Sequence, residues 1–253
     1  MSLLERDIMG GLAKGLSVIE TFTAERPRQS ISEVSVASGL DRATARRCLL
    51  TLAHLGHADY DGKFFTLTPR VLRLGTACLA TMPLPQLVQP LLDRLSEQIG
   101  ESSSVSILDG TDIVYVARAA QRKVMSIGLM PGSRLPAYCT SMGRVLLAAL
   151  PETAATEILT QTSLLARTPR TLTDPKALVA EFERVRLQGH AIVDQEVELG
   201  LRSIAIPLYN SRGQTVAAMN VGLAASRAET DEMARLYLPA MTGVQVELRK
   251  LMR

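Results

Sequence analysis

A short stretch in the second half of the chain gathers side chains that could bind a small acid. Arg134, Tyr138, Thr140 and Ser141 supply a guanidinium, a phenol and two hydroxyls within ten residues. Thr140 or Ser141 can also cap a helix whose first amides are free. A guanidinium and helix-terminal amides bind a carboxylate, and a phenol contacts a ring or forms a hydrogen bond. Caps and a surface charge would explain each residue singly, but together they favour a site for a small carboxylate or hydroxylated ring.

Cys139 lies in the same stretch and offers a different chemistry. A thiol beside a helix start has a lowered pKa, and His190 could serve it as a base, as in a nucleophilic enzyme. The alternative is a small buried cysteine that lines a pocket. We favour the alternative because the sequence shows no third residue to orient the base.

A second polar stretch, residues 194–203, connects two expected strands. Its three acids can be plain solvated loop charges. Leu201, Arg202 and Ser203, where the chain enters the strand, could instead close a pocket over the first stretch. Both interpretations stay open at this point.

The other chemically distinctive region, near the N-terminus, carries cations on an expected helix. Ser30 and Glu33 form an S-x-x-E capping box that begins a short helix, and Gly39 can end it. Asp41 can then cap a second helix that runs to about Leu55. Two helices joined by so short a turn are typical of a helix-turn-helix.

The second helix has one apolar stripe, made by Ala45, Cys48, Leu49 and Leu52 at positions i, i+3, i+4 and i+7. Its opposite face and first turn carry cations and a hydroxyl, which matches a recognition helix in the major groove. We predict that Thr44, Arg46 and Arg47 contact base edges and that Arg42, Ser32 and Lys63 contact phosphates. The plainer alternative, that Arg46 and Arg47 only solvate a three-helix bundle, is less consistent with the order of motifs.

A hairpin is expected after this helix. Residues 58–60 and 64–67 flank Asp61-Gly62, a pair that suits a type I′ turn. Lys63 would then lie near the tip of a wing, beside the DNA backbone. The region is therefore predicted to be a winged helix-turn-helix.

Composition limits the remaining possibilities. The chain has 253 residues, enough for two domains, and a net charge of only +3, from 28 basic and 25 acidic residues. That balance excludes a polycation and leaves DNA binding to a local patch. Three scattered cysteines give no disulfide framework and favour a reducing cytoplasm. With no apolar run of membrane-spanning length, we expect no membrane partner.

Metal and cofactor chemistry lacks support in the sequence. His54, His57 and His190 do not cluster with the cysteines at any ligand spacing, so we expect no metal site. The chain contains neither G-x-x-x-x-G-K-S/T nor G-x-G-x-x-G, and we expect no cofactor.

The spacing of apolar residues, together with prolines and helix caps, predicts the helices that position these residues. A first helix runs from Leu12 and ends before Pro27, and residues 69–82, starting at a Thr68 cap, read as one helix that Pro83 and Pro85 end. That helix either pairs with its copy in a dimer or packs as a spacer on its own chain. We therefore predict domains at residues 1–68 and 83–253, with 69–82 between them.

The second domain mixes helices and strands. We expect strands at 103–108, 113–117, 124–129, 191–194, 203–208 and 215–223, and helices at 88–99, at 140–150, from Pro151, from Pro175 and from a Thr230 cap. This order indicates an α+β domain whose mainly antiparallel sheet is covered by helices.

Together these residues resemble the IclR family of bacterial transcription regulators over nearly the whole chain. The strongest marks are the helix-turn-helix at 30–56, L-P-A-Y-C-T-S-M-G-R at 135–144, and D-Q-E-x-E-x-G-L-R-S-I-A-x-P at 194–207. The segments T-A-R-R-C-L at 44–49 and 135–143 look closest to regulators of protocatechuate, 4-hydroxybenzoate and β-ketoadipate breakdown.

The resemblance implies a winged helix, a dimerising linker helix and a GAF-like effector domain. It also implies homodimers or dimers of dimers on palindromic operators near catabolic promoters. Its effector pocket maps by position onto Ser126, Arg134, Tyr138, Thr140, Ser141, Leu201, Ser203 and Asn220. The main hypothesis is a ligand-responsive regulator that senses an aromatic or dicarboxylic acid. The rival hypotheses are an enzyme with Cys139 as nucleophile and a DNA-binding appendage, and a module that merely dimerises.

Overall fold

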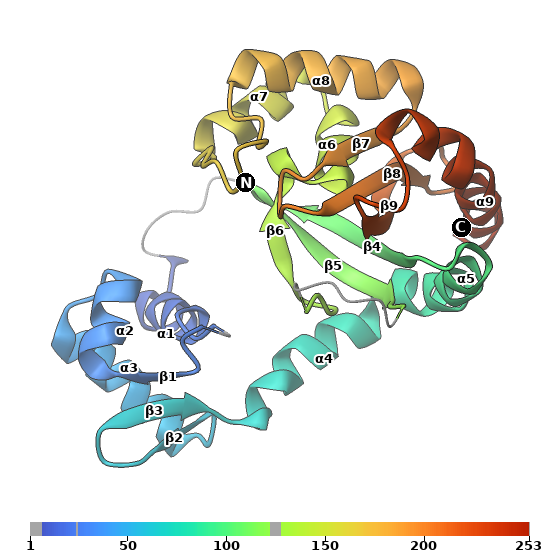
Figure 1. Ribbon diagram of the computed structural model, residues 1–253. Helices are drawn as coiled ribbons and strands as arrows, with labels where there is room; N and C mark the ends of the chain where they lie inside the picture. Colours follow the sequence, from blue (N-terminus) through green and yellow to red (C-terminus); the bar gives the residue numbers. More distant parts are fainter. Residues whose placement is uncertain (1–6, 24, 122–127, 253) are drawn as a thin grey trace. The chain divides into compact units, whose positions relative to one another are not determined.

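The computed structural model describes residues 7–23, 25–121 and 128–252. It divides into two compact units, Met1–Ala80 and Thr81–Arg253 (Figure 1). None of the helices in the described ranges combines the length and hydropathy that crossing a bilayer requires.

The first unit is a small helical bundle with a three-stranded sheet. Its helices and strands are α1 (Gly10–Glu20), β1 (Arg28–Ser30), α2 (Ile31–Ser38), α3 (Arg42–His54), β2 (Ala58–Tyr60), β3 (Phe64–Leu67) and, after a 3-10 turn at Pro69–Val71, α4 (Leu72–Thr81). The sheet has the order β1-β3-β2 with antiparallel pairs. Its core contains Val18, Val34, Leu49 and Phe65.

Side-chain caps begin α2 and α3 where the sequence predicted. The Ser30 hydroxyl accepts the Glu33 amide at 3.4 Å, and the Glu33 carboxylate accepts the Ser30 amide at 2.7 Å. Gly39 ends α2 with φ +69°, and the Asp41 carboxylate accepts the Thr44 amide at 2.9 Å. These bonds satisfy helix-end amides that would otherwise have no partner. The predicted helix-turn-helix is confirmed.

The wing turn differs from the prediction. The residue with positive φ is Gly62, at +100°, whereas Asp61 has an ordinary φ, so a type I′ turn at Asp61-Gly62 is wrong. Asp61 donates its amide to the Phe64 carbonyl at 3.2 Å, and Gly62 and Lys63 form the loop. The Asp61 carboxylate accepts the amides of Lys63 and Phe64 at 2.9 and 2.8 Å, and these bonds hold the aspartate outside the left-handed region.

Three further details of the first unit were not predicted correctly. Strand β1 is too short to leave a periodic pattern, and it forms because β3 supplies its partner. Helix α1 runs from Gly10 to Glu20, so it begins two residues before the predicted start at Leu12. The segment expected as one helix over 69–82 is the 3-10 turn followed by α4, with Thr68 capping the turn as expected.

The second unit is a six-stranded antiparallel sheet with helices on both faces (Figure 1). The strands are β4 (Ser102–Asp109), β5 (Asp112–Ala119), β6 (Arg134–Pro136), β7 (Ala191–Asp194), β8 (Leu201–Tyr209) and β9 (Thr215–Ala224), in the order β6-β5-β4-β9-β8-β7. Helices α5 (Pro83–Ile99) and α9 (Thr230–Leu251) cover one face. Helices α6 (Ser141–Ala148), α7 (Glu152–Gln161) and α8 (Pro175–Gln188) cover the other. The predicted α+β class is confirmed.

Three predictions for the second unit need comment. The strand expected at 124–129 falls largely outside the described residues, and 128 and 129 are not in a strand. Pro83 and Pro85 open α5, because proline is tolerated in a first turn. Thr230 was wrongly predicted as a cap: it is the first residue of α9, and Glu229 precedes it without a side-chain cap bond.

Helix α6 approaches the residues before it so closely that only glycine fits at position 143. A Cβ on Gly143 would lie 2.1 Å from the Ala137 carbonyl oxygen and 2.4 Å from the Ala137 Cα. These are backbone atoms, so the helix would have to move. The contact fixes the start of α6 against the stretch that carries Tyr138 and Cys139.

We therefore expect Gly143→Ala to lower the free energy of unfolding by about 3 kcal/mol, the upper range for overpacking. Urea denaturation followed by circular dichroism measures the change. The matched control is Gly243→Ala in α9, where no atom lies within 4 Å of the new Cβ. It should raise stability by about 0.5 to 1 kcal/mol, because alanine favours a helix interior. Equal midpoints for the two variants would contradict the argument.

Candidate DNA-binding face and effector site

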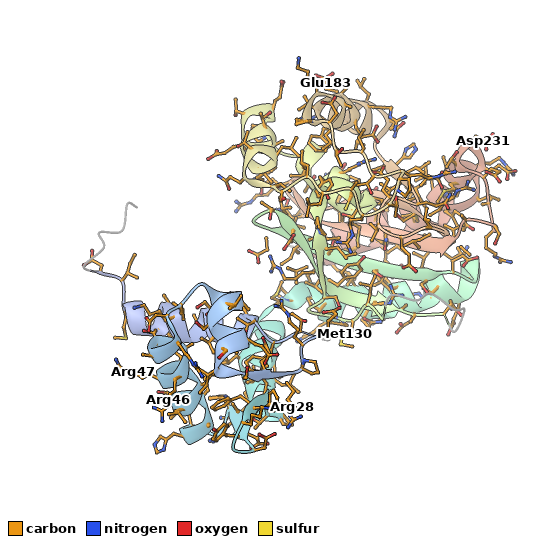
Figure 2. All side chains as sticks on the ribbon, turned by 60° about the vertical axis from the view of Figure 1, so that its left-hand side comes forward. Arg28, Arg46, Arg47, Met130, Glu183 and Asp231 are labelled. Atoms are coloured by element: carbon orange, nitrogen blue, oxygen red, sulfur yellow. The ribbon has the colours of Figure 1, made fainter. Side chains whose placement is uncertain are left out.

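Helix α3 presents its cations to solvent. Ala45, Leu49 and Leu52 are buried, whereas Arg46 and Arg47 are exposed on the opposite face. Figure 2 shows both arginines pointing away from the body of the unit.

The first turn of α3 extends this face. Arg42 is exposed there and Thr44 is partly exposed. Among the residues that the structure describes, no carboxylate pairs with Arg42, Arg46 or Arg47, so their guanidinium groups stay available.

Two other predicted DNA-contacting residues lie on neighbouring elements of the same unit. Ser32 is exposed in the first turn of α2, and Lys63 is exposed in the wing loop. The wing also carries Arg28, which the sequence analysis missed because strand β1 was not predicted. Its guanidinium lies 4.2 Å from the Phe64 ring centroid and pairs with Asp61 at 2.5 Å. Backbone bonds and Arg28 hold the pKa of Asp61 well below its usual range.

The residues predicted from the stretch 134–141 to bind an effector differ in their contacts and burial. Arg134, on strand β6 at the sheet edge, is bound to Asp109 at 2.6 Å and to Asp112 at 3.2 Å. These carboxylates raise the pKa of Arg134 and occupy its guanidinium. The buried Tyr138 donates its hydroxyl to the Leu165 carbonyl at 2.5 Å, and burial raises its pKa.

Thr140 caps α6, as predicted, by accepting the Gly143 amide at 3.1 Å. Cys139 just before it is fully buried, with its thiol 3.6 Å from the Pro136 carbonyl. Burial raises the pKa of Cys139 to about 11, because a thiolate is poorly solvated there. The His190 ring bonds to the Gln188 carbonyl at 3.0 Å instead of serving the thiol.

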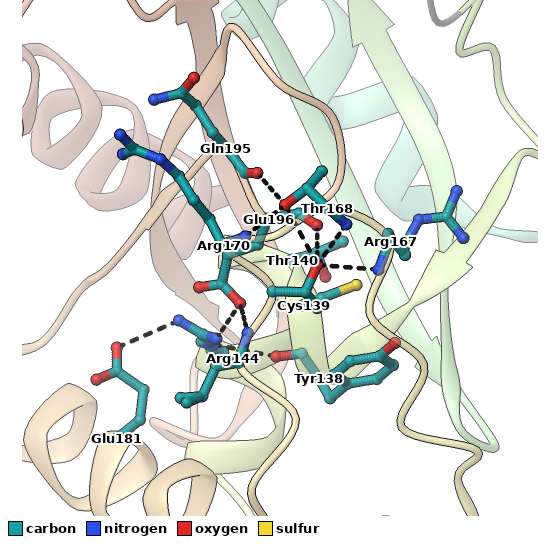
Figure 3. Close-up of polar contacts among 12 residues, drawn as sticks. Tyr138, Cys139, Thr140, Arg144, Arg167, Thr168, Arg170, Glu181, Gln195 and Glu196 are labelled. Atoms are coloured by element: carbon teal, nitrogen blue, oxygen red, sulfur yellow. Dashed lines mark hydrogen bonds and ion pairs between the residues drawn. The ribbon is translucent and has the colours of Figure 1, made fainter.

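Arg144 joins this stretch to distant parts of the second unit through a buried ion network (Figure 3). Its guanidinium binds Glu196 at 2.7 Å and lies 3.7 Å from a Glu181 oxygen. It also donates to the Tyr138 carbonyl at 3.0 Å, and Glu196 accepts the Leu172 amide at 2.8 Å. All three charged side chains are less than a tenth exposed.

Where the second predicted stretch, residues 194–203, enters β8, its side chains alternate between the two faces of the strand. Arg202 binds Asp194 at 2.6 Å and Glu229 at 2.9 Å, on the side opposite Leu201 and Ser203. Glu196, which the sequence left open as a solvated loop charge, is buried in the network of Arg144. No local signal distinguishes it from Glu198, because its partner is 52 residues away.

Four of the predicted effector residues lie on one side of the sheet: Leu201, Ser203, Asn220 and, at the start of α6, Ser141. Ser203 faces Gly222 across β8 and β9, and Asn220 faces Ala205 two residues along, so both side chains lie on the same face. Ala205 belongs to the core that α6 covers, and Ser141 begins α6. The Ser141 hydroxyl and the Asn220 carbonyl oxygen are buried without a hydrogen-bond partner in the described structure. Ser126 lies outside the described residues.

Comparison with known proteins decides the family. The model of the IclR helix-turn-helix domain matches residues 11–62, and that of the bacterial transcriptional regulator IclR C-terminal domain matches residues 76–242. The chain belongs to the IclR family. It is a DNA-binding transcriptional regulator with the α+β architecture described above.

Two relatives cover almost all of this IclR-family chain. The Pca regulon regulatory protein of Pseudomonas putida is 45% identical over 96% of this chain and 84% of its own. The p-hydroxybenzoate hydroxylase transcriptional activator of Acinetobacter baylyi is 36% identical over 97% of this chain and 92% of its own. Both relatives are regulators of transcription by their names.

Two solved structures share the fold. A Rhodococcus sp. RHA1 protein described as a transcriptional regulator has a TM-score of 0.80 and 44% identity, over 96% of this chain and 98% of its own. An IclR homologue of Microbacterium hydrocarbonoxydans, complexed with 4-hydroxybenzoate, has a TM-score of 0.75 and 25% identity, over 95% of this chain and 99% of its own.

The ion network predicts a large effect of Arg144→Met. The variant leaves Glu181 and Glu196 buried without their shared cation, which should cost about 3 to 5 kcal/mol of unfolding free energy at neutral pH. Burial already raises the pKa of Glu196, and loss of Arg144 raises it further. The folded state then binds protons more readily than the unfolded chain, so the deficit should shrink as the pH falls towards about 5.

Urea unfolding of the variant and the unaltered chain at neutral pH and at the lower pH measures both effects. Arg184→Met is the matched control, because Arg184 binds the same Glu181 from a position that is 62% exposed. It should cost less than about 1 kcal/mol at either pH. A deficit for Arg144→Met that is equally small, or that grows in acid, would show that the network does not stabilise the unit.

Proposed function

We propose that this regulator inserts α3 into the major groove of a palindromic operator and responds to a small hydroxylated aromatic acid bound by the second unit. The observation that carries the proposal is the set of unpaired, outward-facing arginines on a helix whose other side is buried. Two other exposed arginines, Arg28 and Arg94, are in contrast paired with acids. Arg46 and Arg47 are free to bind acceptors on bases.

The remaining roles follow from position. Thr44, Arg46 and Arg47 contact base edges, whereas Arg42, Ser32 and Lys63 contact phosphates from the ends and flank of the reading helix. A palindromic site has two equivalent halves, so the binding species is a homodimer or a dimer of dimers. Helix α4 supports a dimerising role for residues 69–82, because Leu72 and Leu74 are exposed on it. Residues 1–68 then bind DNA and 83–253 bind the effector, in the cytoplasm where the DNA lies.

The effector class rests on the relatives and on the chemistry of the sheet face. One relative is named as the transcriptional activator of p-hydroxybenzoate hydroxylase, and the Microbacterium homologue is complexed with 4-hydroxybenzoate. In this chain Ser141 and Asn220 keep buried polar atoms unpartnered, which costs free energy unless a ligand satisfies them. Ser203 and Leu201 extend the same face. Tyr138 and Thr140 hold the start of α6 in place.

We further propose that the chain is not an enzyme. Cys139 is the nucleophile that the rival function requires, yet its thiol is buried, has a raised pKa and is not bonded to His190. A thiolate at this position would be scarce at neutral pH. The described residues also hold no group of three or more His, Cys, Asp and Glu placed to bind a metal ion.

Replacing Arg47 by Ala should weaken binding to operator DNA by about 1 to 3 kcal/mol and relax the base preference, because a bidentate contact to a base edge is lost. Fluorescence anisotropy against the operator, against operators altered one base pair at a time, and against unrelated DNA measures both effects. The control is Arg94→Ala on α5, an exposed arginine bound to Glu247, which should leave DNA affinity unchanged. Unchanged affinity and preference for Arg47→Ala would remove this residue from base reading.

Ser141→Ala should have opposite effects on the free chain and on ligand binding. The serine hydroxyl is buried without a partner, so its removal should raise the thermal midpoint of the free chain. The same change should reduce the additional stabilisation given by 4-hydroxybenzoate, because the ligand loses a hydrogen bond. Differential scanning fluorimetry with and without ligand separates the two effects.

The neighbouring Thr140→Ala is the matched control. Thr140 caps α6, so this variant should lose about 1 kcal/mol in the free chain and keep most of the ligand-induced shift. If Ser141→Ala behaves like Thr140→Ala in both measurements, Ser141 is only structural. If 4-hydroxybenzoate and related acids leave the unaltered chain unshifted, the proposed effector class is wrong.

A further inference from the structure

The strand register places an arginine, Arg118, on the sheet face that carries Asn220 and that α6, which begins at Ser141, covers. Arg118 on β5 is directly opposite Ser104 on β4, and Ser104 is directly opposite Asn220 on β9. Cross-strand partners point to the same side of a sheet. Ser106, two residues beyond Ser104, donates to the Met142 sulfur at 3.2 Å, so this is the side that α6 covers.

Arg118 has no described counter-charge. Its guanidinium donates to the Ser104 hydroxyl at 3.0 Å, and none of the carboxylates in the described ranges lies within ion-pair distance of it. In contrast, Arg134, Arg144 and Arg202 of the same unit each pair with two carboxylates. Residues 122–127 contain no Asp or Glu in sequence. Partial burial lowers the pKa of Arg118, since the cation is desolvated without an anion.

Hydrogen bonds hold both ends of Arg118, the guanidinium through Ser104 and the backbone through α5. The Gln89 side chain on α5 accepts the Arg118 amide at 3.3 Å and donates to the Arg118 carbonyl at 3.0 Å. Tyr115, on the next row of the same face, is 4% exposed, and burial raises its pKa to about 12. It places a neutral phenol ring beside the cation.

The cross-strand row that begins with Arg118 on β5 and passes through Ser104 ends on β9 at Asn220, near the polar groups that would complement the cation. Arg118 and Asn220 are two strands apart, and two strand spacings amount to roughly 10 Å between their Cα atoms. The Asn220 carbonyl oxygen and the Ser141 hydroxyl are two of the buried side-chain atoms that lack a hydrogen-bond partner among the described residues. The face therefore offers an uncompensated cation at one end and acceptor groups at the other, which suits an aromatic ring with a carboxylate opposite a hydroxyl.

We propose that Arg118 binds the carboxylate of the effector, with Ser104 orienting the guanidinium, while Asn220 and Ser141 bond the ring hydroxyl. This assignment rests on the proposed function of the second unit and gives Arg118 the role first expected of Arg134. Arg134 already has two carboxylate partners, whereas an acid bound at Arg118 would supply the missing anion.

The test compares acids with their neutral amides on the full chain. Isothermal titration calorimetry with 4-hydroxybenzoate and with 4-hydroxybenzamide gives the acid-to-amide affinity ratio for each variant. Arg118→Gln should weaken acid binding about 10- to 100-fold, as expected for a lost charge-assisted bond, and bring the ratio near one. Arg134→Gln is the matched control and should keep the ratio of the unaltered chain.

A second variant tests the assignment with the arginine in place. Ser104→Asp puts a carboxylate beside Arg118, so it should abolish acid binding and leave binding of the amide within about threefold, since only the anion competes for the guanidinium. Circular dichroism melting confirms that each variant is folded. A ratio unchanged in both Arg118→Gln and Ser104→Asp, or lost in Arg134→Gln alone, would overturn the assignment of Arg118. An unaltered chain that binds neither compound would overturn the proposed effector class as well.

Discussion

A buried guanidinium is stable only when anions pair with it. In the second unit, the buried guanidinium of Arg144 pairs with carboxylates from two other segments of the chain. Glu196 and Glu181 come from a loop and from α8, and both are drawn to the arginine that follows the first turn of α6. The same side chain bonds the Tyr138 carbonyl, so it fixes the backbone just before the Thr140 cap. Gly143 lets α6 contact this backbone directly. The cap, the glycine contact and the ion network therefore all fix the position of one short segment, where the start of α6 meets the sheet.

Charge pairing separates two kinds of arginine in this chain. Arg134, Arg144 and Arg202 have carboxylates at hydrogen-bond distance, and their contacts join strands, loops and helices of the second unit. Arg46, Arg47 and Arg118 have no such partner among the described residues, although they lie on well-defined elements. An unpaired cation on the outside costs little, because water solvates it. An unpaired cation that is partly buried costs more, which is why Arg118 is the stronger indication of a missing anion.

Features with a local cause were predictable from the sequence. The capping box at Ser30 and the Asp41 cap each need only neighbouring residues, so the helix-turn-helix was predicted correctly. Features with a distant cause were not. Strand β1 forms because β3 accepts it, and the burial of Glu196 depends on Arg144, 52 residues away. The turn at Asp61 shows that a local pattern can also mislead. The Asp61-Gly62 pair suits a type I′ turn, but the Asp61 carboxylate accepts two backbone amides and favours a different turn. The pairing of Arg134 with Asp109 likewise required the β5–β6 register.

If the proposed effector site is right, the unpartnered groups on the α6 face would let a bound ligand stabilise the second unit. A site that satisfied all of its own polar atoms would gain little from binding a polar ring, because each new hydrogen bond would replace an existing one. Asn220, Ser141 and Arg118 lack full partners among the described residues, which makes the free unit less stable than its packing allows. In the proposed complex, a bound acid would recover that free energy through groups at fixed positions on the strands and on α6. Regulation then requires only that these positions differ between two conformations, since a ligand shifts an equilibrium by no more than its difference in affinity for the two states.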